Sequence, residues 1–166
     1  MEHNEVFSWL SEQGWKVQRV FHPADDISFV VTAESTFRLY RPRDGSLVFL
    51  TNYHLSPRQL LRLVQLTWQE YLDLIWELRS TLFSDGFYFH LRPSGCELRF
   101  VEIGLQLWEP ALTKNTVLQS CLRVSDIPAL LHSLLEKHLS AVETWKPESE
   151  QALVKPPGDK PIVHLG

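Results

Sequence analysis

Histidine is the residue type most often used for metal binding and acid–base chemistry, and the 166-residue chain has seven. His132 and His138 lie in one stretch of helical spacing but are six residues apart. Two ligands on one helix face need a spacing of three or four. The sequence also lacks a Gly-x-Ser-x-Gly elbow, a phosphate-binding glycine loop and a His-Glu-x-x-His motif. We therefore expect no enzyme activity, no metal and no cofactor.

One expected strand carries polar side chains that could bind a small ligand. Tyr88, His90 and Arg92 alternate with apolar residues in the run Phe87–Arg92. Alternate residues of a strand point to the same face, so the three share one side of the sheet. They could line a polar pocket of a ligand-binding protein or enzyme, or they could form a solvated face. A small-ligand binder or enzyme that uses this strand face is the alternative to a non-enzymatic protein-binding function.

A small basic patch offers a weaker alternative. Arg38, Arg41 and Arg43 lie close together with Tyr40 between them, a combination that could contact a phosphate of nucleic acid. The same arginines could instead protect a sheet edge from unwanted pairing. The formal charge of −4 disfavours nucleic-acid binding, which depends on an excess of Lys and Arg.

Aromatic residues on a long helix are the feature that points most directly to a partner. Trp68, Tyr71 and Trp76 lie in a segment of helical spacing that we expect to run unbroken from Pro57 to Phe83. Aromatic side chains beyond the number that one core face needs are typical of protein interfaces. We therefore take these three as candidates for a partner or dimer contact, with burial in the core as the alternative.

The start of this helix is well specified. Ser56 suits the N-cap, Pro57 the first helical position and Gln59 the third position of a capping box. The broad apolar face expected from the spacing consists of Leu60, Leu61, Val64, Trp68, Tyr71, Leu72, Ile75, Leu78 and Leu82. This stripe is widened by Leu63, Leu66, Leu74 and Trp76, which suggests contact with a second surface such as another protomer.

The remaining patterns predict strands on both sides of the long helix and a helix at each end. The expected elements are a helix over 4–13, strands over 15–21, 27–32, 37–41 and 47–51, a hairpin over 87–108, a strand-like run over 116–124 and a last helix capped by Ser125. Gly104 is expected to mark a bulge or bend in the second hairpin strand. The fold class is therefore α+β with two layers: helix, three or four antiparallel strands, long helix, two or three antiparallel strands, helix.

Composition bounds the organisation of the chain. With 44% hydrophobic and 22% charged residues, residues 1–145 are expected to form one folded domain, and the proline-rich residues 146–166 a flexible tail. Cys96 and Cys121 are far apart and form no CxxC motif, which fits a reducing compartment. We see no export signal and no apolar run long enough to span a membrane, so we expect a cytoplasmic protein.

The element order over about residues 4–145 resembles the type III secretion chaperone-like fold, and it looks closer still to an uncharacterised archaeal and cyanobacterial-type family with that fold. The residues that carry this resemblance are Trp9-Leu10, Gly14-Trp15, Trp76–Arg79, Arg99–Val101 and Leu112–Asn115. The chain departs from secretion chaperones by its extra strand-like runs at Trp15–Phe21 and Thr116–Val124 and by its proline-rich end.

The resemblance implies a function by binding. Proteins of the chaperone fold are generally homodimers that hold an extended peptide, which agrees with the wide apolar stripe of the expected long helix. We therefore expect a non-enzymatic adaptor or chaperone-like module that binds a protein or peptide, forms a homodimer and contacts neither membrane nor nucleic acid.

Overall fold

The computed structural model describes residues 3–21, 23, 25–94 and 97–140. Its helices and strands in chain order are α1 (His3–Glu12), β1 (Lys16–Arg19), β2 (Asp25–Thr32), β3 (Thr36–Pro42), β4 (Leu47–His54), α2 (Pro57–Leu63), α3 (Trp68–Ser84), β5 (Tyr88–Ser94), β6 (Glu97–Leu107) and α4 (Lys114–Leu139). This order confirms the α+β class expected from the sequence. The expected tail at 146–166, and with it the domain boundary at 145, lies outside the described residues.

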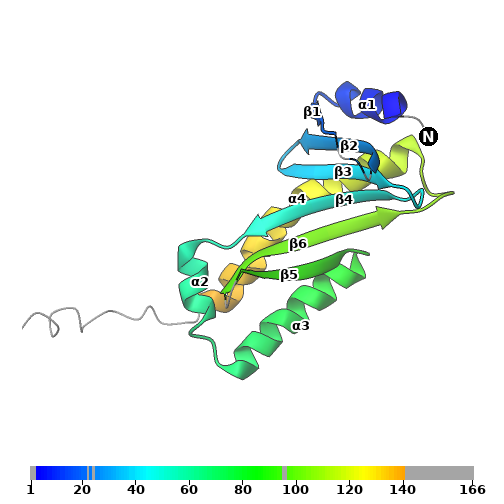
Figure 1. The fold of residues 1–166 in the computed structure, drawn as a ribbon. Helices are drawn as coiled ribbons and strands as arrows, with labels where there is room; N and C mark the ends of the chain where they lie inside the picture. Colours follow the sequence, from blue (N-terminus) through cyan, green and yellow to red (C-terminus); the bar gives the residue numbers. More distant parts are fainter. Residues whose placement is uncertain (1–2, 22, 24, 95–96, 141–166) are drawn as a thin grey trace, which may run out of the picture.

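The strands form one antiparallel sheet in the order β1-β2-β3-β4-β6-β5. β4 therefore joins β1, β2 and β3 to the later hairpin of β5 and β6. Every residue of β4 pairs with a residue of β6, from Leu47 opposite Leu107 to His54 opposite Phe100. Figure 1 shows α4 lying behind the sheet, α1 near β1, and α3 along the margin formed by β5. One face of the sheet is thus covered by α4, and the opposite face carries no helix in the described part of the chain.

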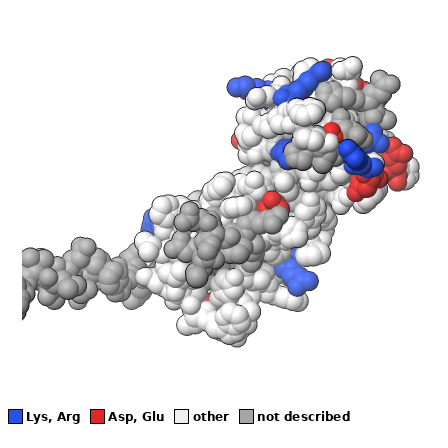
Figure 2. Space-filling model, viewed as in Figure 1, with Lys and Arg blue, Asp and Glu red and all other residues white. Residues whose placement is uncertain are grey.

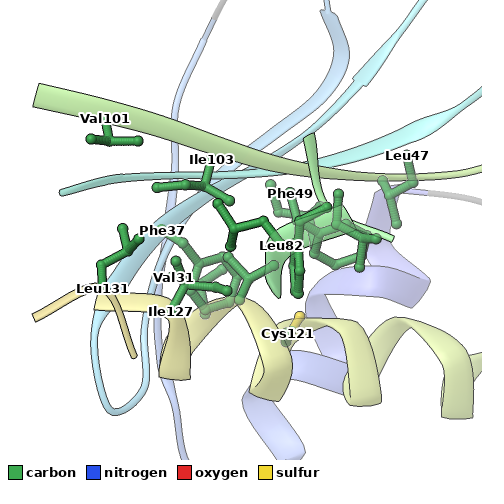
Figure 3. Packing of buried hydrophobic residues seen from close by; sticks show 14 of the residues in the cluster. Val31, Phe37, Leu47, Phe49, Leu82, Val101, Ile103, Cys121, Ile127 and Leu131 are labelled. Atoms are coloured by element: carbon green, nitrogen blue, oxygen red, sulfur yellow. The ribbon is translucent and has the colours of Figure 1, made fainter. Parts of the chain in front are cut away.

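The core lies between the sheet and α4. Along the strands, alternate residues such as Phe37, Phe49 and Ile103 are fully or almost fully buried on the face toward α4. Figure 3 shows them meeting Ile127 and Leu131 of α4. Burial of these side chains is the main force that fixes the helix on the sheet.

The N-terminal half follows the expectation closely. Gly14 ends α1 with a φ of 74°, and Gly45 turns the chain between β3 and β4 with a φ of 83°, both in the left-handed region that glycine adopts without steric cost. The strand expected over 15–21 is β1, shortened to Lys16–Arg19 at the edge of the sheet.

The single helix expected from Pro57 to Phe83 is wrong, because the chain forms two helices there. Ser56 caps α2 through the expected capping box with Gln59. A second box, in which the Thr67 side chain accepts from the Glu70 backbone N–H and the Glu70 carboxylate accepts from the Thr67 backbone N–H, starts α3. Two reciprocal hydrogen bonds stabilise a new helix start, so the chain can turn at residues 64–66.

The strand expected over 116–124 and the cap expected at Ser125 are also wrong. Both segments lie within α4, which begins after Thr113. Thr113 accepts the backbone N–H of Thr116 and so takes the capping role. Ser125 is buried inside the helix, and its hydroxyl donates to the Leu122 carbonyl at 2.8 Å.

Gly104 marks no bulge. It pairs in register with Leu50 on one side and with Tyr88 on the other, and the irregularity of the hairpin lies at Arg92 and Pro93 instead. The aromatic ring of Tyr88 lies so close over Gly104 that a Cβ atom there would overlap it. Glycine is required here by the close approach of a ring and not by a bend in the strand.

Candidate functional site

Only one side of α3 packs against the core of the molecule. Leu74, Leu78 and Leu82, spaced by one helical turn, are at most 2% exposed and face the core. Figure 1 shows the helix at the margin of the molecule, beyond the edge strand β5. The helix therefore keeps a second side turned outward.

That outward side is apolar. Trp68 and Trp76 are 72% and 69% exposed, and Leu72 and Phe83 are 39% and 56% exposed. Their spacings of four, four and seven residues place them in one row along the helix, over roughly 22 Å at about 1.5 Å per residue. We call Trp68, Leu72, Trp76 and Phe83 the outer stripe. Soluble proteins rarely leave such a row uncovered unless it binds something.

Two more apolar side chains are exposed shortly before α3. Leu61 and Val64, on α2 and just after it, are 65% and 76% exposed. In Figure 2 the surface over the lower part of the molecule, where Figure 1 places α3, shows almost no acidic colour and little basic colour. Few charges have to be desolvated if a partner covers it.

One end of the outer stripe is hollowed. Trp76, Arg79, Ser80 and Phe83 line an open depression of about 350 Å³. The Arg79 guanidinium lies over the Phe83 ring, 5.4 Å from its centroid, so the depression contains a cationic group beside its two aromatic rings.

Polar contacts fix α3 against α4. The Glu77 carboxylate receives a hydrogen bond from Nζ of Lys137 at 2.6 Å, and Nε2 of His138 lies 2.6 Å from its other oxygen. The hydrogen bond from Lys137, and second to it that from His138, holds the pKa of Glu77 below its ordinary value. These contacts lie on the flank of α3 opposite the outer stripe, as the helical positions require.

The three aromatic residues that the sequence suggested for a partner contact lie in two different environments. Trp68 and Trp76 lie on the outer stripe, whereas Tyr71 is half-buried and stacks on Trp68 with ring centroids 5.9 Å apart. The broad apolar face expected from the sequence joined Leu61, Val64 and Leu72 to Leu78 and Leu82, but the first three are exposed and the last two are buried. The signal that could have corrected this is the Thr67-x-x-Glu70 capping box, which shifts the helical phase after α2.

The strand face of Tyr88 and His90 is the face of the sheet opposite α4. Their rings are 5.7 Å apart, and burial raises the pKa of Tyr88 to about 12. Arg92 belongs to the same strand, but its side chain lies outside the described part of the structure. Ligand binding at this face stays a prediction.

The three arginines of the basic patch do not act together. Arg38 and Arg41 point to opposite faces of β3, because they are an odd number of residues apart. Arg38 bonds to Asp25 at 2.5 Å and lies over the Tyr40 ring, and Arg41 lies 3.6 Å from Glu109. Of the three, only Arg43 is exposed, in the turn after β3. The two paired guanidinium groups are poorly placed to neutralise phosphates.

The remaining candidates for chemistry are histidines and a cysteine. No group of three or more His, Cys, Asp or Glu residues is placed to hold a metal in the described part of the chain. His132 and His138 have separate contacts, the first with the Tyr53 hydroxyl at 3.2 Å and the second with Glu77. Cys121 is buried, and burial raises the pKa of its thiol. Among the described helices, none combines the length and the apolar character that a bilayer span demands.

The comparisons with known proteins agree with this fold. A family model described as an uncharacterised conserved protein, DUF2299, matches residues 2–135. An uncharacterised protein from Methanothermobacter thermautotrophicus has a TM-score of 0.73 at 17% identity, over 84% of this chain and 99% of that chain. YbjN from E. coli has a TM-score of 0.49 at 14% identity, over 82% of this chain and 91% of that chain. No curated protein matches the sequence.

These findings confirm two expectations. The chain matches an uncharacterised family, and it shares its fold with an archaeal protein whose whole length it covers. The likeness to secretion chaperones stays a prediction. At 17% identity the archaeal structure supports the fold alone.

Proposed function

We propose that this chain, which belongs to the DUF2299 family of uncharacterised conserved proteins, is a protein-binding module without catalytic activity, and that the outer stripe is its contact surface. The observation that carries the proposal is the exposure of Trp68 and Trp76, 72% and 69%, on one side of α3. Tryptophan at the centre of a contact is among the residues that contribute most to binding. The role is that of a cytoplasmic adaptor or chaperone-like protein.

The energetic gain from covering the outer stripe is large. Removing two mostly exposed indole side chains from water is worth on the order of 5 kcal/mol at about 25 cal/mol per Å² of apolar area. Part of this offsets the loss of rotational and translational freedom on association. Leu72 and Phe83 add further apolar area. A stable complex is therefore within reach of this one surface.

A second copy of the chain is the first partner that we propose. The outer stripe has an aromatic residue at each end, Trp68 and Phe83, with Leu72 and Trp76 between them. If two α3 helices packed antiparallel about a two-fold axis near residues 75 and 76, Trp68 of each copy would meet Phe83 of the other. An aromatic residue at each end of the row, paired twice in this way, suits the self-complementary contact of a two-fold dimer.

Fluorine NMR of protein labelled with 5-fluorotryptophan tests this proposal. The six tryptophans include Trp108, which is 52% exposed but lies between β6 and α4, away from the outer stripe. As protein concentration rises, the signals of Trp68 and Trp76 are expected to shift while that of Trp108 stays constant. Signals of Trp68 and Trp76 that do not change with concentration, in protein that has the mass of one chain, would contradict the homodimer. A uniform shift of all exposed rings would indicate non-specific association and would also contradict it.

A further inference from the structure

The chain leaves the described part of the structure at a point beside α3. Lys137 and His138, in the last turn of α4, both contact the Glu77 carboxylate of α3 at 2.6 Å. Trp76, next to Glu77 in the sequence, lines the depression at the end of the outer stripe. Residues 141–155 can span roughly 50 Å when extended, at about 3.4 Å per residue. The residues that follow them are therefore within reach of the depression.

These following residues have the composition of a polyproline ligand. Residues 155–161 read KPPGDKP, and we call them the proline segment. Proline-rich segments bind grooves lined by aromatic rings, because their extended conformation is largely fixed before binding. In the depression, which has a volume of about 350 Å³, the rings are those of Trp76 and Phe83, 69% and 56% exposed. The depression and a segment that suits it thus occur in the same chain.

Charged residues of α3 match the proline segment in sign and spacing. Arg79 lines the depression, and Asp73, which is exposed, lies about one helical turn before Trp76 on the same side of the helix. Asp73 and Arg79 are roughly 9 Å apart along the axis, at about 1.5 Å per residue. Lys155 and Asp159 would be roughly 12 Å apart in polyproline II, at about 3.1 Å per residue, and the long Lys and Arg side chains can cover the difference. Two pairs of opposite charge can therefore form at once.

We propose that the proline segment binds in the depression of its own chain, with its prolines against the Trp76 indole and the Asp159 carboxylate beside the Arg79 guanidinium. This rests on the function proposed above, since the depression belongs to the outer stripe and the segment competes there with a second copy of the chain. The tether gives an effective concentration on the order of 1 mM. With a Kd on the order of 1 mM for the segment, about half of the chains cover their own stripe. Dimerisation needs two free copies and is therefore weakened about fourfold.

Substitutions in the full chain test the proposal. Asp159→Arg places like charges beside Arg79 and is expected to release the proline segment. Pro156→Ala/Pro157→Ala removes ring contacts and is expected to act in the same direction. The matched control is Glu148→Arg, which makes the same change of charge outside the proline segment. Adding Arg79→Glu to Asp159→Arg restores opposite charges and should restore binding, and the exposure of Arg79 keeps this substitution out of the core.

The fluorine signal of Trp76, in protein labelled with 5-fluorotryptophan, reports binding of the segment. Compared with wild type at equal concentration, Asp159→Arg is expected to shift this signal and Glu148→Arg to leave it unchanged. The signal of Trp108 should be the same in all variants. In the Arg79→Glu background, Asp159→Arg is expected to shift the Trp76 signal in the opposite direction, from free to bound. Dilution followed by light scattering should show that Asp159→Arg dimerises about fourfold more tightly than wild type.

Failure of segment binding is distinguishable from failure of the homodimer. An identical Trp76 signal in wild type and Asp159→Arg, an equal shift in Glu148→Arg, or a shift that keeps its direction in the Arg79→Glu background would overturn binding of the segment, whatever the mass of the protein. A shift that appears only as concentration rises would assign the segment to another copy and would overturn binding within one chain. A Trp76 shift in Asp159→Arg, with the mass of one chain in every variant, would support binding of the segment and contradict only the homodimer.

Discussion

Nε2 of His138 and Oε2 of Glu77 lie 2.6 Å apart and join the last turn of α4 to the middle of α3. Lys137 reaches the second oxygen of the same carboxylate, also at 2.6 Å. Together with the buried row of Leu74, Leu78 and Leu82, this contact determines which side of α3 faces inward. Because this side of α3 faces inward, the outer stripe is left exposed.

The substitution Glu77→Gln is expected to lower the free energy of unfolding by about 0.5–1 kcal/mol, the range typical of solvent-accessible ion pairs. The glutamine keeps the size of the side chain but loses the charge that both Lys137 and His138 contact. Urea unfolding measures the difference. A matched control is Glu34→Gln, for which no change is expected, and equal stability of the two variants would contradict the role of Glu77.

The contribution of Glu77 should depend on pH. Its pKa is lowered in the folded protein, chiefly by Lys137 and then by His138, below the ordinary value of 4.5. A lowered folded pKa stabilises the protein above the unfolded pKa, and that stabilisation is lost as pH falls through the folded value. The stability difference between wild type and Glu77→Gln is therefore expected to be constant above about pH 5.5 and to shrink below pH 4.5. A difference that grows on acidification would contradict this sign.

Thr67→Ala is expected to destabilise the protein by about 1 kcal/mol, because it removes the side chain that caps α3. Thr67→Ser keeps the hydroxyl and should retain most of the stability. Thermal unfolding of the two variants makes the comparison. If alanine and serine behave alike, the capping box does not contribute to the start of α3.

Gly104→Ala is expected to cost about 1–3 kcal/mol, since the new methyl group would overlap the Tyr88 ring. The same substitution in a Tyr88→Ala background should cost little or nothing, because the ring that it meets is gone. A double-mutant cycle from urea unfolding gives the coupling between the two positions. Additive effects of the two substitutions would show that the ring does not require glycine at 104.

The sequence was sufficient for the positions of the strands β1 to β6, though not for their order in one sheet, and for the helix ends that are marked by two agreeing signals. Ser56, Pro57 and Gln59 start α2 where expected, and the alternation of β2 and β3 gave the correct faces. The break between α2 and α3 was missed because leucines and tryptophans continue a helical spacing across residues 64–66. Local apolar spacing cannot distinguish one helix from two when both have wide apolar faces.

The error in α4 has a different cause. β-branched residues in 116–124 suggested a strand, yet Val117, Cys121 and Val124 are spaced by four and three residues and are all buried against the sheet. Tertiary packing outweighs the small intrinsic preference of β-branched side chains for strands. The candidate site was predicted in part: Trp68 and Trp76 were identified from composition and spacing, but their exposure required the structure, because aromatic residues serve cores and interfaces alike.

The mass of the protein in solution tests the central claim most directly. Light scattering after size exclusion should give twice the chain mass of 19.3 kDa for the wild type, the single-chain mass for Trp68→Ser/Trp76→Ser, and again twice that mass for the matched control Trp108→Ser. A wild type that is monomeric up to high concentration, or a double variant that remains dimeric, would contradict the proposal that the outer stripe joins two copies of this chain.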